Sequence, residues 1–352
     1  MQVSEQVRED DKATNIQKLV EKYLEHACFA KDYLTRKAGE EDLFTSADAD
    51  KVKKQVLRYL QVKDKYLSLG SMLFKSQLFH TVYGNKSTSP TAVPIVELPR
   101  TESKRPYIPL RAAFQRPDNV QEENLYPFSV SHQFPFVALA RHELFSGDPP
   151  TDDDIANPPH KIGIDVVTFD KINPKLYSNE QEFINVFRQS FTEWEWERIN
   201  NNTTAGSPFH EFYVRWSMKE AYTKALGVGM GLAFDGFDMR TDLDNDCETG
   251  LWPIIRGNHD GISTYASIVH HGKTSDPVVT VEKWEFFFLP LKDGKNDNVN
   301  SLHAKGCLCI CVGNGKIANE STKHKIRVEW TTMESLLRWH SPNIGKEYRT
   351  PP

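Results

Sequence analysis

One short stretch of the sequence, RWSMKEAYTKALG at 215–227, places an acid and an amine one helical turn apart. On a helical wheel of about 100° per residue, an apolar stripe is formed by Val214, Met218, Ala221, Tyr222 and Ala225. Glu220 lies outside this stripe, beside Trp216 on one side and Lys224 on the other. The other cations of the stretch project from the opposite flank: Arg215 and Lys219. A Glu–Lys pair at this spacing contributes only about 0.2–0.5 kcal/mol and is most often a solvated surface, so a functional role needs further residues.

A second acid, Asp165, occurs in the apolar run KIGIDVV, which predicts a buried strand. An unpaired buried carboxylate costs several kcal/mol, so Asp165 needs a partner. That partner is often a loop amide, which would give the acid a purely structural role. Asp165 and Glu220 together nevertheless offer two hard oxygen ligands from separate elements, a set that suits Mg²⁺ better than Zn²⁺.

Cationic and hydroxyl-bearing residues upstream could complete a site for a phosphate-rich ligand. The loop LPRTESKRP contains Arg100, Thr101, Ser103, Lys104 and Arg105, and the run FSVSHQ contains Ser131 and His132. Each feature alone is most often structural, as a solvated basic loop or a histidine at a strand end. Metal, cations and hydroxyl donors together are the groups that phosphoryl chemistry uses.

The composition is that of an ordinary folded protein: 352 residues, of which 39% are hydrophobic and 26% charged. The formal net charge of −5 argues against non-specific nucleic-acid binding, so an anionic ligand must be held by a local cluster. No run of about 18 apolar residues predicts a membrane span. The polar start, MQVSEQVREDDKATNIQ, lacks the apolar core of a signal peptide. We therefore expect neither a nucleic-acid nor a membrane partner.

Five cysteines in a chain of this length fit a reducing compartment, and we expect a cytoplasmic protein. Cys307, Cys309 and Cys311 alternate in GCLCICVG, which places the three thiols on one face of a strand. Neighbouring side chains on one strand face cannot complete a tetrahedral metal shell alone. The pattern therefore favours small core-filling residues over a metal site.

The order of elements predicts an α+β protein in two lobes. Helical periodicity at 15–35 and 48–80 is followed by four strand-like runs: AVPIVEL, YIPLRAAF, YPFSVS and FPFVALA. The acidic, proline-rich stretch GDPPTDDDIANPPH is the best linker candidate. Both halves contain helices and strands without the strict alternation of a doubly wound sheet. The chain therefore divides into an N-terminal lobe (1–146), a linker (147–160), a C-terminal lobe (161–340) and a tail (341–352).

In the second half, capping signals delimit the helices. Thr192 and Glu195 predict a capping box for TEWEWERIN, and glycines end the helix at 209–227. FDGFDM, VTVEKWEFFFLP and KGCLCICVG predict strands of a meander, with a polar loop at 290–303. Thr331 and Glu334 predict a final short helix.

These motifs, in their order and spacing, resemble the 4′-phosphopantetheinyl transferases of the Sfp type. The hallmark is a G-[IV]-D strand followed by W-[SA]-x-K-E-[AS]-x-x-K, which residues 163–165 and 216–224 match position by position. The resemblance spans roughly residues 55–315 and is closest to the eukaryotic subgroup that activates the aminoadipate reductase of lysine metabolism. It implies two similar α+β lobes with the active site, holding coenzyme A and a metal, in the cleft between them. A single chain completes such a cleft, so the resemblance favours a monomer.

The resemblance also implies roles for individual residues. Asp165 and Glu220 would hold Mg²⁺ against the pyrophosphate of coenzyme A, which Lys224 would also contact. The 3′-phosphate and adenine side would fall to residues upstream: Lys63, Arg100, Thr101, Lys104, Arg105, Ser131 and His132. Many bacterial members carry a third acid where this chain has Val167. Two carboxylates plus waters are therefore expected here, with one water held by Gln133.

The implied reaction moves the 4′-phosphopantetheine arm from coenzyme A to a serine of an apo carrier domain and releases 3′,5′-ADP. The carrier would belong to aminoadipate reductase, or to fatty-acid, polyketide or non-ribosomal peptide synthases. The catalytic set would be Glu220, Asp165, Lys224 and His132, with Glu220 as the base that takes the serine proton.

Two other interpretations remain open. A non-catalytic carrier-protein or coenzyme A-binding module on the same fold predicts a damaged metal pair, whereas both acids are present here. An unrelated Mg²⁺-dependent nucleotide-binding enzyme needs a phosphate loop of its own, and no G-x-x-x-x-G-K-[ST] occurs in the chain.

Overall fold

A computed structural model describes part of the chain, and the account below concerns that part. The described residues are 17–18, 20–21, 24, 49–83, 95–96, 98, 100–102, 105–108, 127–141, 161–201, 207–246, 250–271, 281–291, 304–313, 326–331, 333 and 336. The linker at 147–160, the tail at 341–352, most of the 290–303 loop, and Ser103, Lys104 and Glu334 lie outside this set. The same holds for most of the predicted helix at 15–35, although its few described residues are helical.

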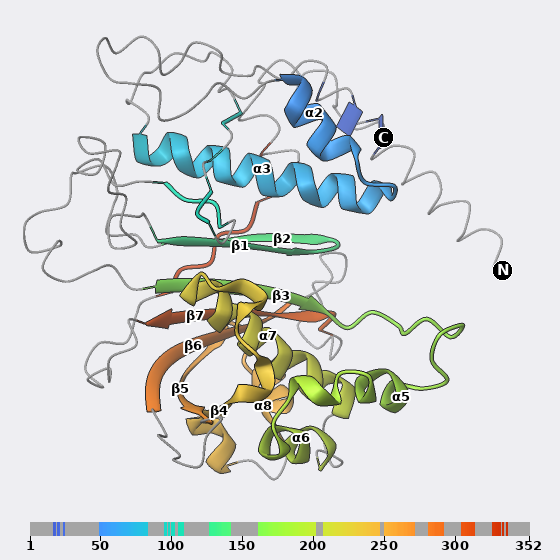
Figure 1. Cartoon of the computed structure of the whole chain (residues 1–352), viewed down its shortest axis with the longest axis vertical. Coiled ribbons are helices and arrows are strands. Elements are labelled where there is room, and N and C mark those ends of the chain that lie inside the picture. The colour runs from blue at the N-terminus through green and yellow to red at the C-terminus, as the bar shows by residue number, and fades with distance from the viewer. Residues whose placement is uncertain are drawn as a thin grey trace, which may run out of the picture.

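The described elements form successive layers (Figure 1). The outermost layer contains α2 (Ala49–Leu57) and α3 (Val62–Tyr83), and the next is the hairpin of β1 (Phe128–Gln133) and β2 (Phe136–Arg141). A five-stranded sheet follows, made of β3 (Lys161–Thr168), β4 (Phe237–Thr241), β5 (Ile262–His270), β6 (Val281–Leu291) and β7 (Gly306–Gly313). The last layer is helical: α5 (Glu180–Asn185), α6 (Glu193–Asn200), α7 (Pro208–Leu226) and α8 (Leu251–Gly257). The predicted α+β class is confirmed.

The helix predicted at 48–80 is wrong in one respect, because the chain breaks it between α2 and α3. Leu60 in the break is almost fully exposed. The reversal lets Val56 of α2 join Leu69 and Leu73 of α3 in one buried cluster. A continuous helix would carry Val56 away from those residues, since each residue adds about 1.5 Å along the axis. Burial of both apolar faces therefore decides the break.

Of the four strands predicted in the first half, the last two form the antiparallel hairpin β1–β2. The described residues of the first two runs form no strand, and nearby an isolated bridge joins Arg100 to Pro106. Most residues of both runs, including Pro94 and Pro109, lie outside the described part of the chain, so these two strands stay predictions.

The larger sheet has the strand order β3-β7-β6-β5-β4, with all neighbouring strands antiparallel. Strands β4 to β7 form the predicted meander, which includes a strand that the sequence patterns did not single out, β5. Strand β3 is added at the edge beside β7, with Asp165 opposite Cys309. Strand β3 is thus an edge strand, and it packs against the β1–β2 hairpin.

The two faces of this sheet bury different partners. One face packs against α7 and α8 in a core that includes Met218, Tyr222 and Trp252. The three alternating cysteines point into this core as free, fully buried thiols, which confirms their core-filling role: Cys307, Cys309 and Cys311. The opposite face packs against the hairpin through residues such as Ile164 and Ala140. The predicted capping box of Thr192 and Glu195 at α6 is also confirmed.

The chain returns to the first layer at its C-terminal end (Figure 1). Ile326 packs with the core between sheet and hairpin, whereas Leu336 is buried with α2 and α3. Met333 lies against the same cluster, close to Gly70 of α3. Met333 and Leu336, assigned by sequence to the C-terminal lobe, thus join the N-terminal helical layer. The similarity of the two lobes stays a prediction. No helix in the described part combines the length and the apolar character needed to cross a membrane.

Candidate active site

Strand β3 and helix α7 cross at unusually short range, and this crossing builds the site. A Cβ atom on Gly163 would lie 1.8 Å from the Ala221 carbonyl oxygen and 2.6 Å from the Ala225 nitrogen. Only glycine on the strand and small residues on the helix permit this approach. The glycine of the G-[IV]-D motif is therefore explained by backbone contact, and the contact sets Asp165 opposite the last turns of α7.

Local signals set where α7 begins and ends. The Ser207 side chain accepts a hydrogen bond from the Phe209 nitrogen at 3.1 Å, and Pro208 occupies the first turn, where its missing N–H is not needed. Gly227 ends the helix with a left-handed φ of 77°. The pocket-facing side chains of α7 are thus presented by a regular, capped helix.

Asp165 finds its partners on two different elements. Lys224 Nζ donates to Asp165 Oδ1 at 2.5 Å and to Ser131 Oγ at 3.1 Å. Ser131 Oγ in turn donates to the same Asp165 oxygen at 2.9 Å. Strands β1 and β3 are also joined directly, because the Ile164 nitrogen donates to Ser129 Oγ at 3.2 Å. The hairpin, the sheet edge and α7 therefore meet at one carboxylate.

Glu220 lies on the same side of α7 but is held more loosely. Its Oε2 is 4.0 Å from Lys224 Nζ, and 23% of its side chain remains exposed. Burial raises the pKa of Glu220, the Lys224 ammonium lowers it, and the Asp165 carboxylate raises it further. A raised pKa makes a carboxylate a stronger base, so Glu220 is better suited to accept a proton than an ordinary surface glutamate.

His132 follows Ser131 on β1 and faces the same pocket. Burial lowers its pKa, and the nearby ammonium groups of Lys224 and Lys75 lower it further. The carboxylates of Asp64 and Asp165 act in the opposite direction, but the net shift is downward, which favours the neutral imidazole at pH 7. Lys75, on α3, was not singled out from the sequence, and no spacing signal connects it to His132.

These residues line one pocket of about 320 Å³ between β1, β3 and α7. Its lining comprises Val130, Ser131, His132, Gln133, Asp165, Val166, Val167, Tyr213, Trp216, Glu220 and Lys224. The structure thus brings together Asp165, Glu220, Lys224, Ser131 and His132, with Gln133 and Val167 beside them. Tyr213 was missed, although its spacing of three, seven and eleven residues from Trp216, Glu220 and Lys224 places all four on one helix face.

Other residues predicted for ligand binding lie elsewhere. Lys63 is exposed on the first turn of α3 and does not line this pocket. Arg100 lines a separate small hollow with Lys75, of about 30 Å³. Thr101 and Arg105 close a tight turn, in which the Arg105 nitrogen donates to Thr101 Oγ1 at 3.1 Å. Arg105 also reaches the Phe128 carbonyl of β1 at 3.4 Å. Lys104 lies outside the described residues.

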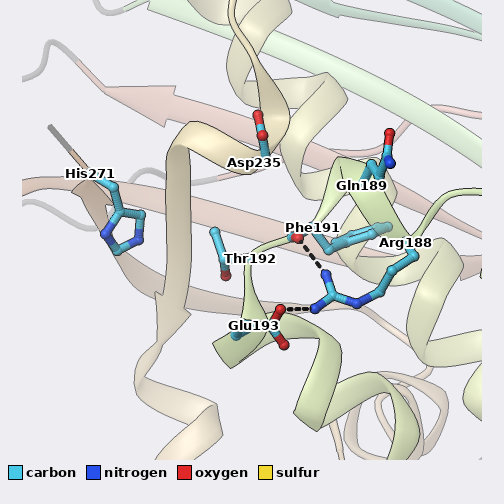
Figure 2. A pocket seen from close by; sticks show the side chains of 7 residues that line it. All are labelled: Arg188, Gln189, Phe191, Thr192, Glu193, Asp235 and His271. Carbon is cyan, nitrogen blue, oxygen red and sulfur yellow. Dashed lines mark hydrogen bonds and ion pairs between the residues drawn. The ribbon is translucent and has the colours of Figure 1, made fainter. Parts of the chain in front are cut away.

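A larger hollow, of about 570 Å³, contains none of the predicted site residues (Figure 2). Two of its charged groups are already matched, because Arg188 pairs with Glu193 and donates to the Phe191 carbonyl at 3.1 Å. His271, on the opposite wall, lies 3.2 Å from the buried Asp238 carboxylate. Size alone therefore does not identify the reactive site, and the smaller pocket is the better candidate.

The donor set of the smaller pocket fits a divalent cation. Asp165 and Glu220 come from separate elements, face one pocket, and repel each other enough for Asp165 to raise the Glu220 pKa. A cation between them would relieve that repulsion, and Mg²⁺ takes one or two protein carboxylates and fills its shell with water and phosphate oxygens. Within the described residues no group of three or more acidic, histidine or cysteine side chains is placed to hold a metal. The site is therefore suited to a phosphate-bearing ligand accompanied by one metal ion.

The comparisons with known proteins agree with this class of site. Residues 161–281 match the family model of the 4′-phosphopantetheinyl transferase superfamily, a range that includes Asp165, Glu220 and Lys224. This match confirms the resemblance found in the motifs. Strand β1, with Ser131 and His132, lies outside the matched range.

Three curated relatives illustrate the similarity. A phosphopantetheinyl transferase of Thraustochytrium sp. is 31% identical over 160 residues, which are 44% of this chain and 45% of the relative. The L-aminoadipate-semialdehyde dehydrogenase-phosphopantetheinyl transferase of Rattus norvegicus is 30% identical over 128 residues, 34% of this chain and 36% of the relative. The protein of that name in Schizosaccharomyces pombe is 29% identical over 182 residues, 52% of this chain and 60% of the relative. Each alignment thus spans less than two thirds of the relative.

Proposed function

We propose that this protein is a 4′-phosphopantetheinyl transferase that moves the phosphopantetheine arm of coenzyme A onto a serine of an apo carrier domain. One observation carries the proposal. Asp165 and Glu220, which belong to the two halves of the family motif, are 55 positions apart in the sequence, yet both line one pocket together with Lys224. They meet because strand β3 and helix α7 cross closely at Gly163. If Asp165 and Glu220 faced separate surfaces, they could not bind one ligand together.

The proposed transfer of the phosphopantetheine arm needs a base and a stabilised leaving group. The serine oxygen of the carrier forms a bond to the β-phosphorus of coenzyme A, the bond from that phosphorus to 3′,5′-ADP breaks, and the serine proton passes to Glu220. The raised pKa of Glu220 supports this role. Lys224 would neutralise charge on the departing pyrophosphate oxygen, while Ser131 and Asp165 hold the ammonium in place.

Charge balance supports a metal in the same pocket. The ligand carries roughly −4, counting about −2 for the 3′-phosphate and about −1 for each pyrophosphate phosphorus. Asp165 and Glu220 would hold Mg²⁺, which supplies positive charge to the pyrophosphate when bound. The neutral His132, near the ammonium groups of Lys224 and Lys75, would meet the adenine and 3′-phosphate side. Lys63 and the 100–105 turn would lie further out along that side.

The carrier and the location are part of the proposal. The names of two of the relatives point to an aminoadipate-semialdehyde dehydrogenase as the carrier, and hence to lysine biosynthesis. Carriers of fatty-acid, polyketide or peptide synthases present the same kind of serine and are further candidates. We also propose that the protein is a monomer and acts in the cytoplasm. The free, buried thiols of Cys307, Cys309 and Cys311 support a reducing compartment.

Intact-mass measurement tests the proposal. The full chain is incubated with Mg²⁺, coenzyme A and an apo carrier domain of an aminoadipate reductase, and the domain is then weighed. We expect the mass to rise by one phosphopantetheine arm, and we expect a carrier with its serine replaced by alanine to stay unchanged. An unmodified wild-type carrier would contradict the transferase and leave a binding module as the better account.

A further inference from the structure

Helix α7 presents its pocket-lining residues in a chemical order. Tyr213, Trp216, Glu220 and Lys224 follow one another along one helix face and all line the pocket. At about 1.5 Å per residue, this stripe runs about 16 Å along the axis. It begins with two aromatic rings, passes to a carboxylate and ends with an ammonium. The proposed function uses only the charged end.

At the aromatic end of this stripe, neighbouring rings hold the Tyr213 side chain in place. Its ring packs edge-on against Phe209, with centroids 4.9 Å apart, and stacks with Phe183 at 6.2 Å. Burial raises the pKa of Tyr213 to about 12, and the charge of Asp170 raises it as well. The hydroxyl therefore stays protonated at neutral pH and can donate a hydrogen bond. The aromatic neighbours of Tyr213 hold its ring, and the side chain is half-buried and lines the pocket.

Coenzyme A has a matching order of groups. Its pyrophosphate is followed by a carbon bearing two methyl groups, then by a hydroxyl and two amides. With the pyrophosphate at Lys224 and Glu220, an arm that runs along α7 passes its methyl groups over Trp216. Its polar groups then come to Tyr213. The opposite direction, toward His132 and Gln133, is polar and suits the nucleotide instead.

We propose that Tyr213 is a specificity-determining residue that binds the pantetheine arm, with its hydroxyl donating to a carbonyl or hydroxyl oxygen of the arm and Trp216 packing against the methyl groups. This assignment rests on the proposed transfer reaction and goes further by naming the path of the arm. It predicts that Tyr213 contributes to the binding of coenzyme A but not to that of 3′,5′-ADP, which lacks the arm.

Calorimetric titration of the full chain with each ligand, in the presence of Mg²⁺, tests this path. In Tyr213→Phe we expect coenzyme A to bind about 3- to 10-fold more weakly, the loss typical of one neutral hydrogen bond, with 3′,5′-ADP unchanged. Tyr222→Phe is the matched control. It removes a hydroxyl from the opposite face of the same helix, where it bonds to Glu282 at 3.2 Å, and should leave both affinities unchanged.

Each other result has a definite meaning. Equal affinity of wild type and Tyr213→Phe for coenzyme A overturns the role of Tyr213 while leaving the transferase intact. An equal loss for both ligands also overturns it, because the residue would then act through the shape of the pocket. A wild-type protein that binds neither ligand overturns the proposed function together with this assignment.

Discussion

Helix α7 carries charged side chains on two sides, and the two sides differ in how many of those charges are paired with an opposite charge. On the side facing α6, α8 and β4, Lys219 and Arg215 are almost fully buried. Lys219 Nζ pairs with Glu195 at 2.9 Å and donates to the carbonyls of Phe234 and Phe237 at 2.6 and 2.8 Å. On the pocket side, Glu220 has one cation at 4.0 Å and remains partly exposed.

Arg215 is likewise buried and paired with acids of the fold. It bonds to Glu211 at 2.9 Å and to Asp244 at 2.6 Å, and Glu211 also accepts from the nitrogens of Leu251 and Trp252. Such a network fastens the helix to its neighbours and offers no place for a ligand. The incompletely matched side is where a ligand can supply the missing charge. Identical residue types thus serve structure or chemistry according to the number of partners that the fold provides.

The largest effect should follow from breaking the matched side. Lys219→Met removes the ammonium that pairs directly with the buried Glu195 carboxylate, and the free energy of unfolding should fall by about 3–5 kcal/mol. Urea unfolding measures the change. Lys171→Met, at an exposed position, is the control and should stay near the wild-type stability. A loss below about 1 kcal/mol would mean that the buried pair does not hold the helix.

The pocket side should show the reverse behaviour. Glu220→Gln keeps the size of the side chain but removes the base, so transfer to the carrier should slow by about 10²- to 10³-fold while the melting temperature changes little. Glu193→Gln, at an exposed pair elsewhere, is the control. Transfer at a near wild-type rate by the Glu220 variant would remove this residue from the chemistry.

Gly163→Ala should affect both sides at once. The added Cβ would collide with the Ala221 carbonyl, which cannot move without shifting α7, so stability should fall by about 1–3 kcal/mol. The rate of transfer should fall too, because Asp165 of β3 and Lys224 of α7 pair across this crossing. The control is Gly257→Ala at the end of α8, where a Cβ would meet no atom within 4 Å. Unfolding curves and transfer rates of both variants decide the matter.

The smallest effect concerns the periphery of the pocket side. Arg100 is exposed and lines a separate hollow, so Arg100→Ala should raise the KM for coenzyme A only about 2- to 5-fold and leave kcat unchanged. Steady-state kinetics measure both constants, with Arg256→Ala of α8 as the control. An unchanged KM would exclude the 100–105 turn from the binding site.

Much of the local structure could be predicted from sequence because its causes are local. The strand-like runs YPFSVS and FPFVALA predict the hairpin strands, and the Thr192–Glu195 spacing predicts the cap of α6. The break between α2 and α3 could not be predicted in this way. It depends on Val56 reaching residues of the next helix, and periodicity within one segment carries no information about that contact.

The site divides in the same manner. Sequence by itself determined the acids and amine of the motif, their spacing on the helix and the glycine of β3, since these follow from residue type and from 3.6 residues per turn. Only the tertiary structure decided that Lys224 pairs with Asp165, that Arg215 and Lys219 are buried, and that Tyr213 faces the pocket. A helical wheel gives the direction of a side chain but not the element that covers it, and that cover decides whether a charge is matched, buried or left for a ligand.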